Sequence, residues 1–268
     1  MIIIKIFGGI GNQMFQYALG RRLSLEQKTG LVFDVSWYKN SPDRLFTLNH
    51  FNISGKGITV FQKISSLFIP HIKESSFAFD SKILSVGKNV FLTGYWQNLK
   101  YFEEIESILR KDFIPKDIQG EKYEALLKKI SGSNSVSLHV RKGDYLSGKN
   151  VRVYESCTPE YYKKAVKYIK EKTGDIELFV FSDDEDWVKK NISFGFPVTL
   201  VSEKGFIDYQ ELMLMSLCKH NITANSTFSW WGAWLNQNKK KIVVTPKKWF
   251  ISEEKKEAAL IPSSWIRL

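Results

Sequence analysis

The second half of the chain alternates short apolar runs with segments of helical periodicity, and this alternation limits the fold more than any other feature. Thr158 followed by Pro159 is typical of a helix start, and Gly174 is typical of a helix end. Further expected strands span 136–140, 176–181, 198–201, 221–224 and 241–245, and further expected helices span 183–191, 208–219 and 226–238. Strands that alternate with helices form βαβ units, so the sequence predicts an α/β fold with a parallel sheet covered on both faces.

The first half begins with the same kind of unit and then becomes less regular. Its expected elements are a strand at 2–7, a turn at 8–13, a helix at 14–27, a strand at 31–35, and helices at 103–111 and 121–130. Residues 36–100 show weaker periodicity, and we expect an irregular region there. A small, polar stretch at 131–134 predicts a boundary between two domains, 1–130 and 131–268.

The chain carries a formal net charge of +11, which favours an anionic partner. Its lysines are spread along the sequence without a nucleic-acid-binding motif, so a nucleotide or an anionic membrane surface is a better candidate than a DNA groove. Cys157 and Cys218 are too few for a disulfide framework and lack the spacing of metal ligands. The first residues resemble neither a signal peptide nor a membrane span, so we expect a cytoplasmic protein with a peripheral contact to the inner membrane.

A glycine-rich turn follows the first expected strand. Gly9 and Gly11, with Asp34 at the end of the next strand, partly match a dinucleotide-binding fingerprint. Met14 stands where that fingerprint requires a small residue. The simpler alternative is a tight strand-to-helix turn that needs a positive φ angle.

Charged residues follow the strand at 136–140, at the edge where open α/β sheets bind ligands. His139 and Arg141 alternate onto one face, and Asp144 follows a glycine just beyond them. Arginine offers a planar fork for phosphate, and aspartate can act as a base. The structural alternative is a surface ion pair between Arg141 and Asp144.

Acidic residues follow the next strand, beginning with Asp183 and Asp184. The run Asp184-Glu185-Asp186 fits an Asp-x-Asp pattern that holds a divalent metal on a nucleotide-sugar diphosphate in one class of enzymes. Acidic residues in the first turn of a helix also interact favourably with its dipole. Both interpretations stay open at this point.

Small polar residues precede the last expected helix, in the run Asn225-Ser226-Thr227-Phe228-Ser229. A helix start has backbone N–H groups without intrahelical partners, and these groups and the helix dipole can hold a diphosphate. The structural alternative is a simple N-cap at Ser226, with Trp230, Trp231 and Trp234 in the core.

These segments together resemble glycosyltransferase family 11, the α-1,2-fucosyltransferases. The resemblance rests on ordered blocks within residues 7–235: Phe7-Gly8-Gly9-Ile10-Gly11-Asn12-Gln13-Met14-Phe15-Gln16-Tyr17-Ala18, His139-Val140-Arg141-Lys142-Gly143-Asp144-Tyr145, Phe181-Ser182-Asp183-Asp184, Glu211-Leu212-Met213-Leu214-Met215-Ser216 and Asn225-Ser226-Thr227-Phe228-Ser229-Trp230-Trp231-Gly232. Lys142 stands where the family often has a second arginine, which favours Arg141 as the ligand of the diphosphate.

The resemblance implies a GT-B-like fold of two Rossmann-like lobes with a donor-binding cleft between them. Residues 1–130 would form the acceptor side and 131–268 would bind GDP-fucose. The implied reaction transfers L-fucose from GDP-β-L-fucose to the 2-hydroxyl of a galactoside, with inversion and without a metal or other cofactor. The implied setting is the synthesis of a surface glycan such as O-antigen or capsule.

The resemblance also implies residue roles. Arg141 would hold the β-phosphate, Asn12 would reach the reacting sugar or the acceptor, and Asp144 is the candidate base. His139 and Glu211 would face guanine. The remaining nucleotide-binding residues would be Gly9, Gly11, Asp183, Asp184, Asn225, Ser226, Thr227, Phe228 and Ser229.

Two alternatives from other functional classes stay open on the sequence alone. One is a dinucleotide-dependent oxidoreductase that uses Gly9, Gly11 and Asp34. The other is a non-catalytic carbohydrate-binding protein that uses its tryptophans. The oligomeric state and the natural acceptor are not predicted.

Overall fold

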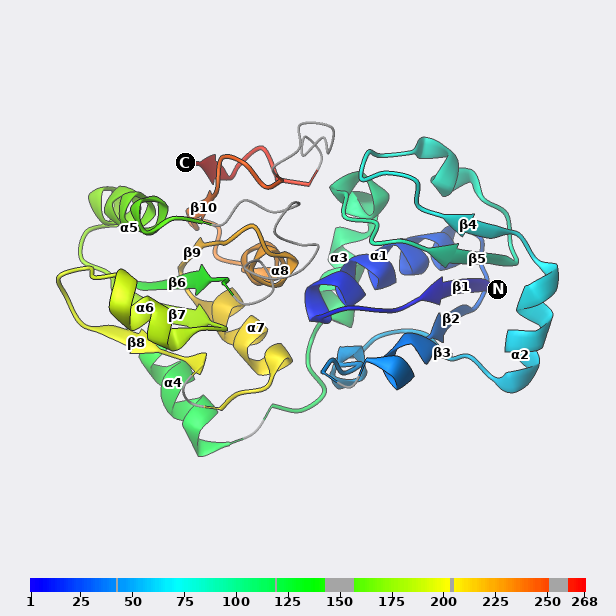
Figure 1. Ribbon diagram of the computed structural model, residues 1–268, viewed down its shortest axis with the longest axis horizontal. Helices are drawn as coiled ribbons and strands as arrows, with labels where there is room; N and C mark the ends of the chain where they lie inside the picture. The colour runs from blue at the N-terminus through cyan, green and yellow to red at the C-terminus, as the bar shows by residue number, and fades with distance from the viewer. Residues whose placement is uncertain (42, 119, 143–156, 203–204, 251–259) are drawn as a thin grey trace. The chain divides into compact units, whose positions relative to one another are not determined.

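The computed structural model describes residues 1–41, 43–118, 120–142, 157–202, 205–250 and 260–268. The chain divides into two compact units. The first contains Met1–Asp117 with the described residues 260–262, and the second contains the described part of 118–253 with Ser263–Leu268. Each unit is built around its own parallel sheet (Figure 1).

The first unit has a five-stranded sheet in the order β3-β2-β1-β5-β4. Its strands are β1 (Ile2–Lys5), β2 (Leu31–Asp34), β3 (Lys56–Gly57), β4 (His71–Lys73) and β5 (Val90–Thr93), and every pairing is parallel. The chain moves outward from β1 through β2 and β3 and then crosses to the other side. The strand order therefore reverses between β1 and β5, where β1 passes through the glycine turn into helix α1 (Ile10–Glu26).

Helix α1 packs closely on one face of this sheet. Gly20 makes the approach possible, because a Cβ atom there would lie 2.9 Å from Leu31 Cδ1 and 3.2 Å from Ile4 Cγ2. The opposite face carries a smaller cluster of Ile3, Val32 and Phe91.

The segment 36–100, which was expected to be irregular, contributes three of the five strands of this sheet. That expectation was wrong because these strands are two to four residues long and are separated by short helices. Such strands carry too little periodicity to be recognised. The helices of the unit besides α1 are η1 (Ser36–Asn40), η2 (Leu48–His50), α2 (Val60–Ser65), η3 (Ser66–Phe68), η4 (Ser81–Ser85), η5 (Leu99–Tyr101), η6 (Glu103–Ile105) and α3 (Glu106–Asp112).

The second unit has a six-stranded sheet in the order β11-β10-β9-β6-β7-β8. Its strands are β6 (Ser135–Val140), β7 (Glu177–Ser182), β8 (Val198–Leu200), β9 (His220–Ile222), β10 (Val243–Thr245) and β11 (Ile266–Arg267), all paired in parallel. This is the strand order of a Rossmann fold, with the reversal between β6 and β9. The expected α/β fold is confirmed.

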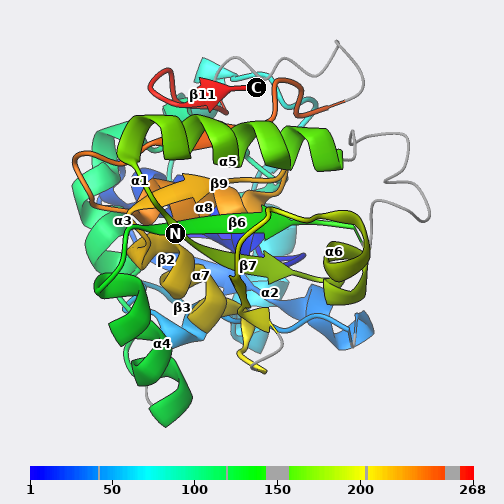
Figure 2. The same ribbon diagram turned by 90° about the vertical axis from the view of Figure 1, so that its left-hand side faces the viewer.

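Helices cover both faces of this second sheet (Figure 2). They are α4 (Glu121–Ser131), α5 (Pro159–Thr173), α6 (Glu185–Asn191), α7 (Asp208–Leu217) and α8 (Thr227–Leu235). Residues of α5 and α6 pack with Val136, Leu138 and Leu178, whereas residues of α4 and α7 pack with Phe179 and Phe181. The Thr158 side chain caps α5 and Gly174 ends it with φ +81°, as expected.

The compact units meet in the sequence between Asp117 and Ile118. This position differs from the expected boundary near 131–134, because α4 belongs with the second unit. Tyr123, Leu126 and Ile130 of α4 pack in one cluster with Phe179 and other residues of the second sheet. A small, polar loop after a helix therefore marked the end of that helix and the start of β6.

Helices α7 and α8 approach each other closely at Gly232. A Cβ atom at this position would lie 2.9 Å from Met215 Cβ, which is held by the backbone of α7. We expect Gly232→Ala to destabilise the protein by about 1–3 kcal/mol, the usual cost of overpacking a core. Thermal unfolding should show a lower Tm, by roughly 2–4 °C for each kcal/mol.

The matched control is Gly30→Ala, because a Cβ atom there would meet nothing within 4 Å. Its stability should stay within about 1 kcal/mol of wild type. Equal Tm values for the two variants would show that α7 and α8 do not need the close contact.

Candidate active site

Candidate residues meet at the carboxyl edge of the second sheet, where its strand order reverses. The register pairs Val140 with Ser182 and Leu138 with Ile222, so β6 ends beside both β7 and β9. In open α/β sheets this is the position at which ligands bind. The sequence motifs after these three strands therefore belong to one site.

Arg141 is held by Asp183 at this edge. Arg141 Nη1 lies 3.0 Å from Asp183 Oδ2, and both side chains are partly exposed. The other oxygen of Asp183, Oδ1, accepts a hydrogen bond of 2.9 Å from the backbone N–H of Lys142. The carboxylate thus fixes the guanidinium from the neighbouring strand. The alternative partner considered for Arg141, Asp144, lies outside the described residues.

Lys142 leaves the strand in the opposite direction from Arg141. Its Nζ donates to the carbonyl oxygen of Cys157 at 3.1 Å and lies 3.9 Å from the ring centre of Trp187. Burial lowers the pKa of this ammonium group. Lys142 therefore supports the structure beneath the edge, and the phosphate-binding role expected for Arg141 stays a prediction.

His139 is buried beneath the start of α8. Its Nδ1 lies 2.9 Å from Ser229 Oγ, and its ring centre lies 5.4 Å from that of Phe228. Burial and, secondly, the charge of Arg141 lower the pKa of His139 to about 3, so the ring is neutral at neutral pH. The observed contacts position α8, and the expected contact with guanine stays a prediction.

Helix α8 begins at this edge without the serine cap that was the structural alternative for Ser226. Ser226 is the N-cap residue and is extended, and within the described structure its side chain makes no capping hydrogen bond. The first-turn N–H groups, including those of Thr227 and Phe228, thus belong to a helix start that favours an anion. Trp230 and Trp231 are fully buried, which confirms the core interpretation for them.

Asn225 fastens the segment that leads into α8. Its Nδ2 donates to the carbonyl oxygen of Trp249 at 3.2 Å, and its Oδ1 lies 3.7 Å from Cys157 Sγ. Both contacts tie the loop to its neighbours. They show a positioning role, and a direct contact of Asn225 with a nucleotide stays a prediction.

Glu211 of α7 has a raised pKa. Burial raises the pKa of Glu211 to about 7; a hydrogen bond from Ser202 opposes the rise, and the charges of Glu185 and Asp208 add to it. The Ser202 hydroxyl also accepts from the backbone N–H of Ser182 at the end of β7, 3.0 Å away. Glu211 is therefore close to half-ionised at neutral pH.

Asp184 caps a helix. Its Oδ1 accepts from the backbone N–H of Trp187 at 2.9 Å, at the start of α6. Across the part of the chain that the structure describes, no three His, Cys, Asp or Glu side chains gather as a metal site would require. The contact with Trp187 supports the structural interpretation of an acid at a helix start, and the expected contact of Asp184 with the nucleotide stays a prediction.

The glycine turn of the first unit lies at the reversal between β1 and β5. Gly8 has φ +79°, as a tight turn requires, and α1 begins at Ile10, earlier than expected. Asn12 Oδ1 accepts from Gln97 Nε2 at 2.9 Å. Gln13, for which the sequence offered no role, is buried and donates to the carbonyl oxygens of Gly8 and Leu45.

Asp34 is the last residue of β2 and is buried. Its Oδ1 accepts from the backbone N–H of Ser36 at 3.0 Å, which accounts for an acid at the end of β2. The close contact between helix and strand lies at Gly20 and not near Met14, where a dinucleotide fingerprint places it.

Glu74 is a residue of this region that sequence reasoning missed. Its two oxygens accept from the backbone N–H groups of Tyr95 at 2.6 Å and Trp96 at 3.0 Å, and burial raises its pKa to about 6. Trp96 has φ +58°. Glu74 therefore holds a strained loop that follows β5 and includes Gln97. No sequence signal marks it, since it lies in the segment expected to be irregular.

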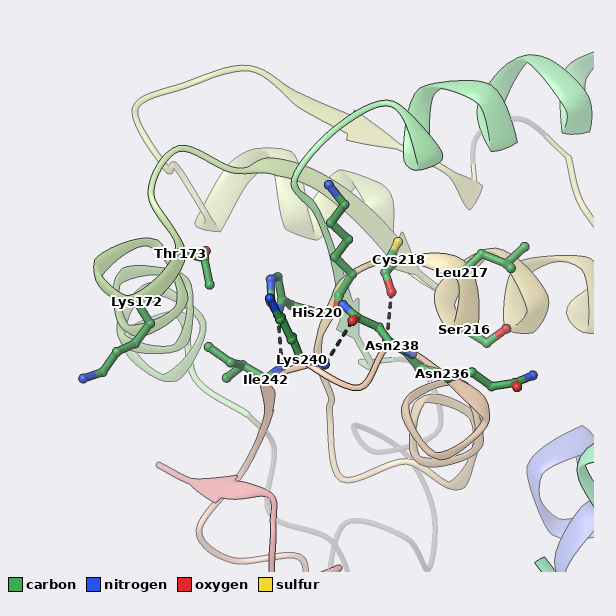
Figure 3. Close-up of a pocket in the computed structure, with 12 residues that line it drawn as sticks. Lys172, Thr173, Ser216, Leu217, Cys218, His220, Asn236, Asn238, Lys240 and Ile242 are labelled. Atoms are coloured by element: carbon green, nitrogen blue, oxygen red, sulfur yellow. Dashed lines mark hydrogen bonds between the residues drawn. The ribbon is translucent and has the colours of Figure 1, made fainter. Parts of the chain in front are cut away.

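A pocket of about 680 Å³ lies at the opposite, amino edge of the second sheet (Figure 3). It is lined by the ends of α5 and α7 and by the turn after α8. Its polar groups bond one another: Asn236 Nδ2 donates to the carbonyl oxygen of Cys218, and Ile242 N to His220 Nδ1. These contacts hold the turn between α8 and β10, so the pocket is separate from the candidate site.

The model of the family described as glycosyl transferase family 11 matches residues 1–268. The chain belongs to glycosyltransferase family 11. This membership confirms the resemblance that the motifs carry, and it replaces the oxidoreductase that Gly9, Gly11 and Asp34 suggested. The same membership argues against the second alternative, a non-catalytic carbohydrate-binding protein.

Relatives from Escherichia coli match nearly the whole of this family 11 glycosyltransferase. An alpha-1,2-colitosyltransferase is 36% identical over 287 residues, covering 100% of this chain and 99% of its own. The O-antigen biosynthesis glycosyltransferase WbnK is 33% identical over 300 residues, covering 97% and 98%. A galactoside 2-alpha-L-fucosyltransferase of Caenorhabditis elegans is 25% identical, covering 90% of this chain and 71% of its own.

Solved structures of similar fold include fucosyltransferases. A mutant of FUT1 from Arabidopsis thaliana in complex with GDP has a TM-score of 0.52 at 12% identity, covering 99% of this chain and 75% of its own. NodZ alpha-1,6-fucosyltransferase soaked with GDP-fucose has a TM-score of 0.51 at 15% identity, covering 87% and 91%. The likeness confirms the expected GT-B-like fold with two Rossmann-like units.

Over the described ranges, none of the helices combines the length and the apolar character that crossing a bilayer requires.

The pairing of Arg141 with Asp183 leads to a prediction about the expected binding of GDP. Arg141→Lys keeps the charge but loses the fork, so we expect the Kd for GDP to rise at least about tenfold, since a hydrogen bond to a charged group contributes about 1.5–3 kcal/mol. Asp183→Asn should weaken binding less, because it frees the guanidinium without removing it. Titration calorimetry measures both.

The matched control is Arg110→Lys, which alters an ion pair of 2.9 Å with Glu106 on the surface of α3. Its GDP affinity should equal that of wild type. If folded Arg141→Lys protein also bound GDP as wild type does, Arg141 would not contact the diphosphate.

The raised pKa of Glu211 predicts two pH dependences. Under the role that the resemblance implies, an ionised Glu211 would accept from guanine, so GDP affinity should fall as pH drops below about 7, and Glu211→Gln should remove this part of the fall. The folded carboxyl holds its proton above the unfolded pKa, so wild-type stability should also decline between about pH 5 and 8 relative to Glu211→Gln.

Phosphate itself titrates near pH 6, so the difference in slope between the wild type and Glu211→Gln is the quantity to measure. Thermal unfolding without GDP, measured as a function of pH, tests the predicted pH dependence of stability. If the wild type and Glu211→Gln gave parallel pH profiles in both assays, the pKa of Glu211 would not be raised.

Proposed function

We propose that this family 11 glycosyltransferase transfers L-fucose from GDP-β-L-fucose to the 2-hydroxyl of a terminal β-galactoside, forming an α-1,2 linkage. The observation that carries the proposal is Arg141, held by Asp183, beside the start of α8 at the reversal of strand order. The α-1,2 linkage in the name of the colitosyltransferase and the galactoside fucosyltransferase among the relatives support the linkage and the acceptor. The O-antigen relative supports a role in surface-glycan synthesis in the cytoplasm.

The proposed reaction is a single displacement. The oxygen of the acceptor 2-hydroxyl attacks the anomeric carbon of fucose, and the bond from that carbon to the β-phosphate oxygen breaks. GDP leaves with the bonding electrons, so one displacement inverts the anomeric centre. Asp144 is the candidate base that takes the hydroxyl proton, and Asn12 is the candidate contact to the sugar or the acceptor.

The proposed enzyme needs no metal or other cofactor. Negative charge develops on the leaving diphosphate as the glycosyl bond breaks. The Arg141 guanidinium and the N–H groups at the start of α8 lie where they can stabilise this charge. Both groups are preorganised, Arg141 by Asp183 and α8 by the contact of Ser229 with His139.

A second donor deserves the same test, because a colitosyltransferase is 36% identical over the whole chain. Colitose is L-fucose without its 3-hydroxyl. A site that hydrogen-bonds this hydroxyl rejects the deoxy sugar, whereas a site lined by apolar groups discriminates weakly. The roles of Arg141 and Ser226 are the same for both donors, since these residues concern the diphosphate.

The deciding experiment supplies the purified enzyme with GDP-fucose or GDP-colitose and with lactose as acceptor. We expect transfer of fucose to the galactose 2-hydroxyl, identified by NMR, with activity retained in EDTA. Arg141→Lys is the negative control. Transfer of colitose alone would replace the proposed donor, and a loss of activity in EDTA that Mn²⁺ restores would overturn metal independence.

Nucleotide selectivity is measured on the same protein by thermal shift. A ligand at a hundred times its Kd stabilises the folded state by about 2.7 kcal/mol, so GDP should raise the Tm while UDP and ADP do not.

A further inference from the structure

The segment formed by α2 and η3 exposes an unusual number of large apolar side chains. Val60, Phe61, Ile64, Leu67 and Phe68 are 55% to 85% exposed. Their spacing places them on one face of the helical segment, because residues three, four, seven and eight apart lie on the same side. The segment connects β3 to β4 on the outside of the first unit (Figure 1).

The polar side of this segment faces the protein. Ser66 is buried, and its hydroxyl donates to the carbonyl oxygen of Lys63 at 2.7 Å. His71 Nε2 lies 2.8 Å from the Ser66 carbonyl oxygen, which fastens the segment to β4. A surface helix ordinarily buries its apolar face and exposes its polar one, so the orientation here is inverted.

The start of the segment is stabilised without any burial of the apolar face. Thr59 and Gln62 form a reciprocal capping box, with hydrogen bonds of 3.2 Å and 3.0 Å. The fold of the first unit thus holds α2 through its caps and its polar side. The apolar side is mostly exposed and contributes little to that packing.

The charged residues that flank the segment in the sequence are positive. The sequence has no aspartate or glutamate from Arg44 to Lys73. Lys56 on β3, Lys63 within α2 and Lys73 on β4 are all exposed. An apolar face flanked by lysines complements a surface that offers anionic headgroups above an apolar layer.

We propose that α2 and η3 form a docking surface for an anionic lipid bilayer. Phe61 and Phe68 enter the boundary between headgroups and acyl chains, and the flanking lysines contact lipid phosphates. A second copy of the chain is disfavoured as occupant, because self-association would bring the same lysines together. The proposal does not depend on which sugar the enzyme transfers.

The test uses the full chain with a reporter in the segment. Both cysteines of the protein, Cys157 and Cys218, are buried, so an environment-sensitive dye can be attached selectively to Ile64→Cys. We expect its emission to shift to the blue with vesicles of phosphatidylcholine containing about one-third phosphatidylglycerol, and not with phosphatidylcholine alone. High salt should weaken the effect because it screens the lysines.

Co-sedimentation with the same vesicles tests the individual side chains. The double variant Phe61→Ser/Phe68→Ser should lose at least about tenfold in vesicle affinity, while its Tm and its GDP-induced thermal shift stay at wild-type values. The matched control is Ile114→Ser/Leu217→Ser, which removes two exposed apolar side chains elsewhere and should bind vesicles as wild type does.

Three results would overturn the proposal. They are an absence of binding to anionic vesicles, vesicle binding that the Phe61→Ser/Phe68→Ser variant retains, and a dimer in gel filtration that the same variant converts to a monomer. The last result would assign the surface to a second copy of the chain.

Discussion

Parallel pairing of β6 with β7 on one side and with β9 on the other is the constraint on which the second unit depends. Because the chain leaves β6 toward β7 and leaves β9 toward β10, in opposite directions, no described crossover covers the edge between β6 and β9. Arg141, Asp183 and the start of α8 lie at this break. A family 11 enzyme can place a cation, its orienting carboxylate and a helix dipole at one point because the sheet pairs in this order.

Burial changes the ionisation of the side chains at that edge more than ion pairs do. His139 is neutral because its ring is buried beneath α8, and Glu211 carries only part of a charge at neutral pH for the same reason. Lys142 turns toward Trp187 on the other side of the strand. Arg141 is thus the cation that accompanies the helix start, and Asp183 holds it from the next strand.

The sequence predicted the second unit well, because its strands and helices are long enough to show their periodicity. It placed Arg141 and Ser226 at the ends of strands, but it gave Asp183 no connection to Arg141. That pairing depends on the register of β6 with β7, which no local pattern encodes. The strands of 36–100 and the loop held by Glu74 were missed because they are short and are stabilised by partners distant in sequence. The role of Asp144 stays a prediction.

The contact at Gly232 has a consequence for the length of the ligand. Glu211 lies on α7, and the proposed diphosphate site lies at the start of α8. Because Met215 and Gly232 leave no space for a further atom, this contact limits how far the two helices can shift toward each other. Under the proposed roles, the spacing of α7 and α8 would then set the distance between the carboxylate that faces guanine and the groups that hold the β-phosphate. The missing side chain of a single glycine would define the size of nucleotide that the enzyme accepts.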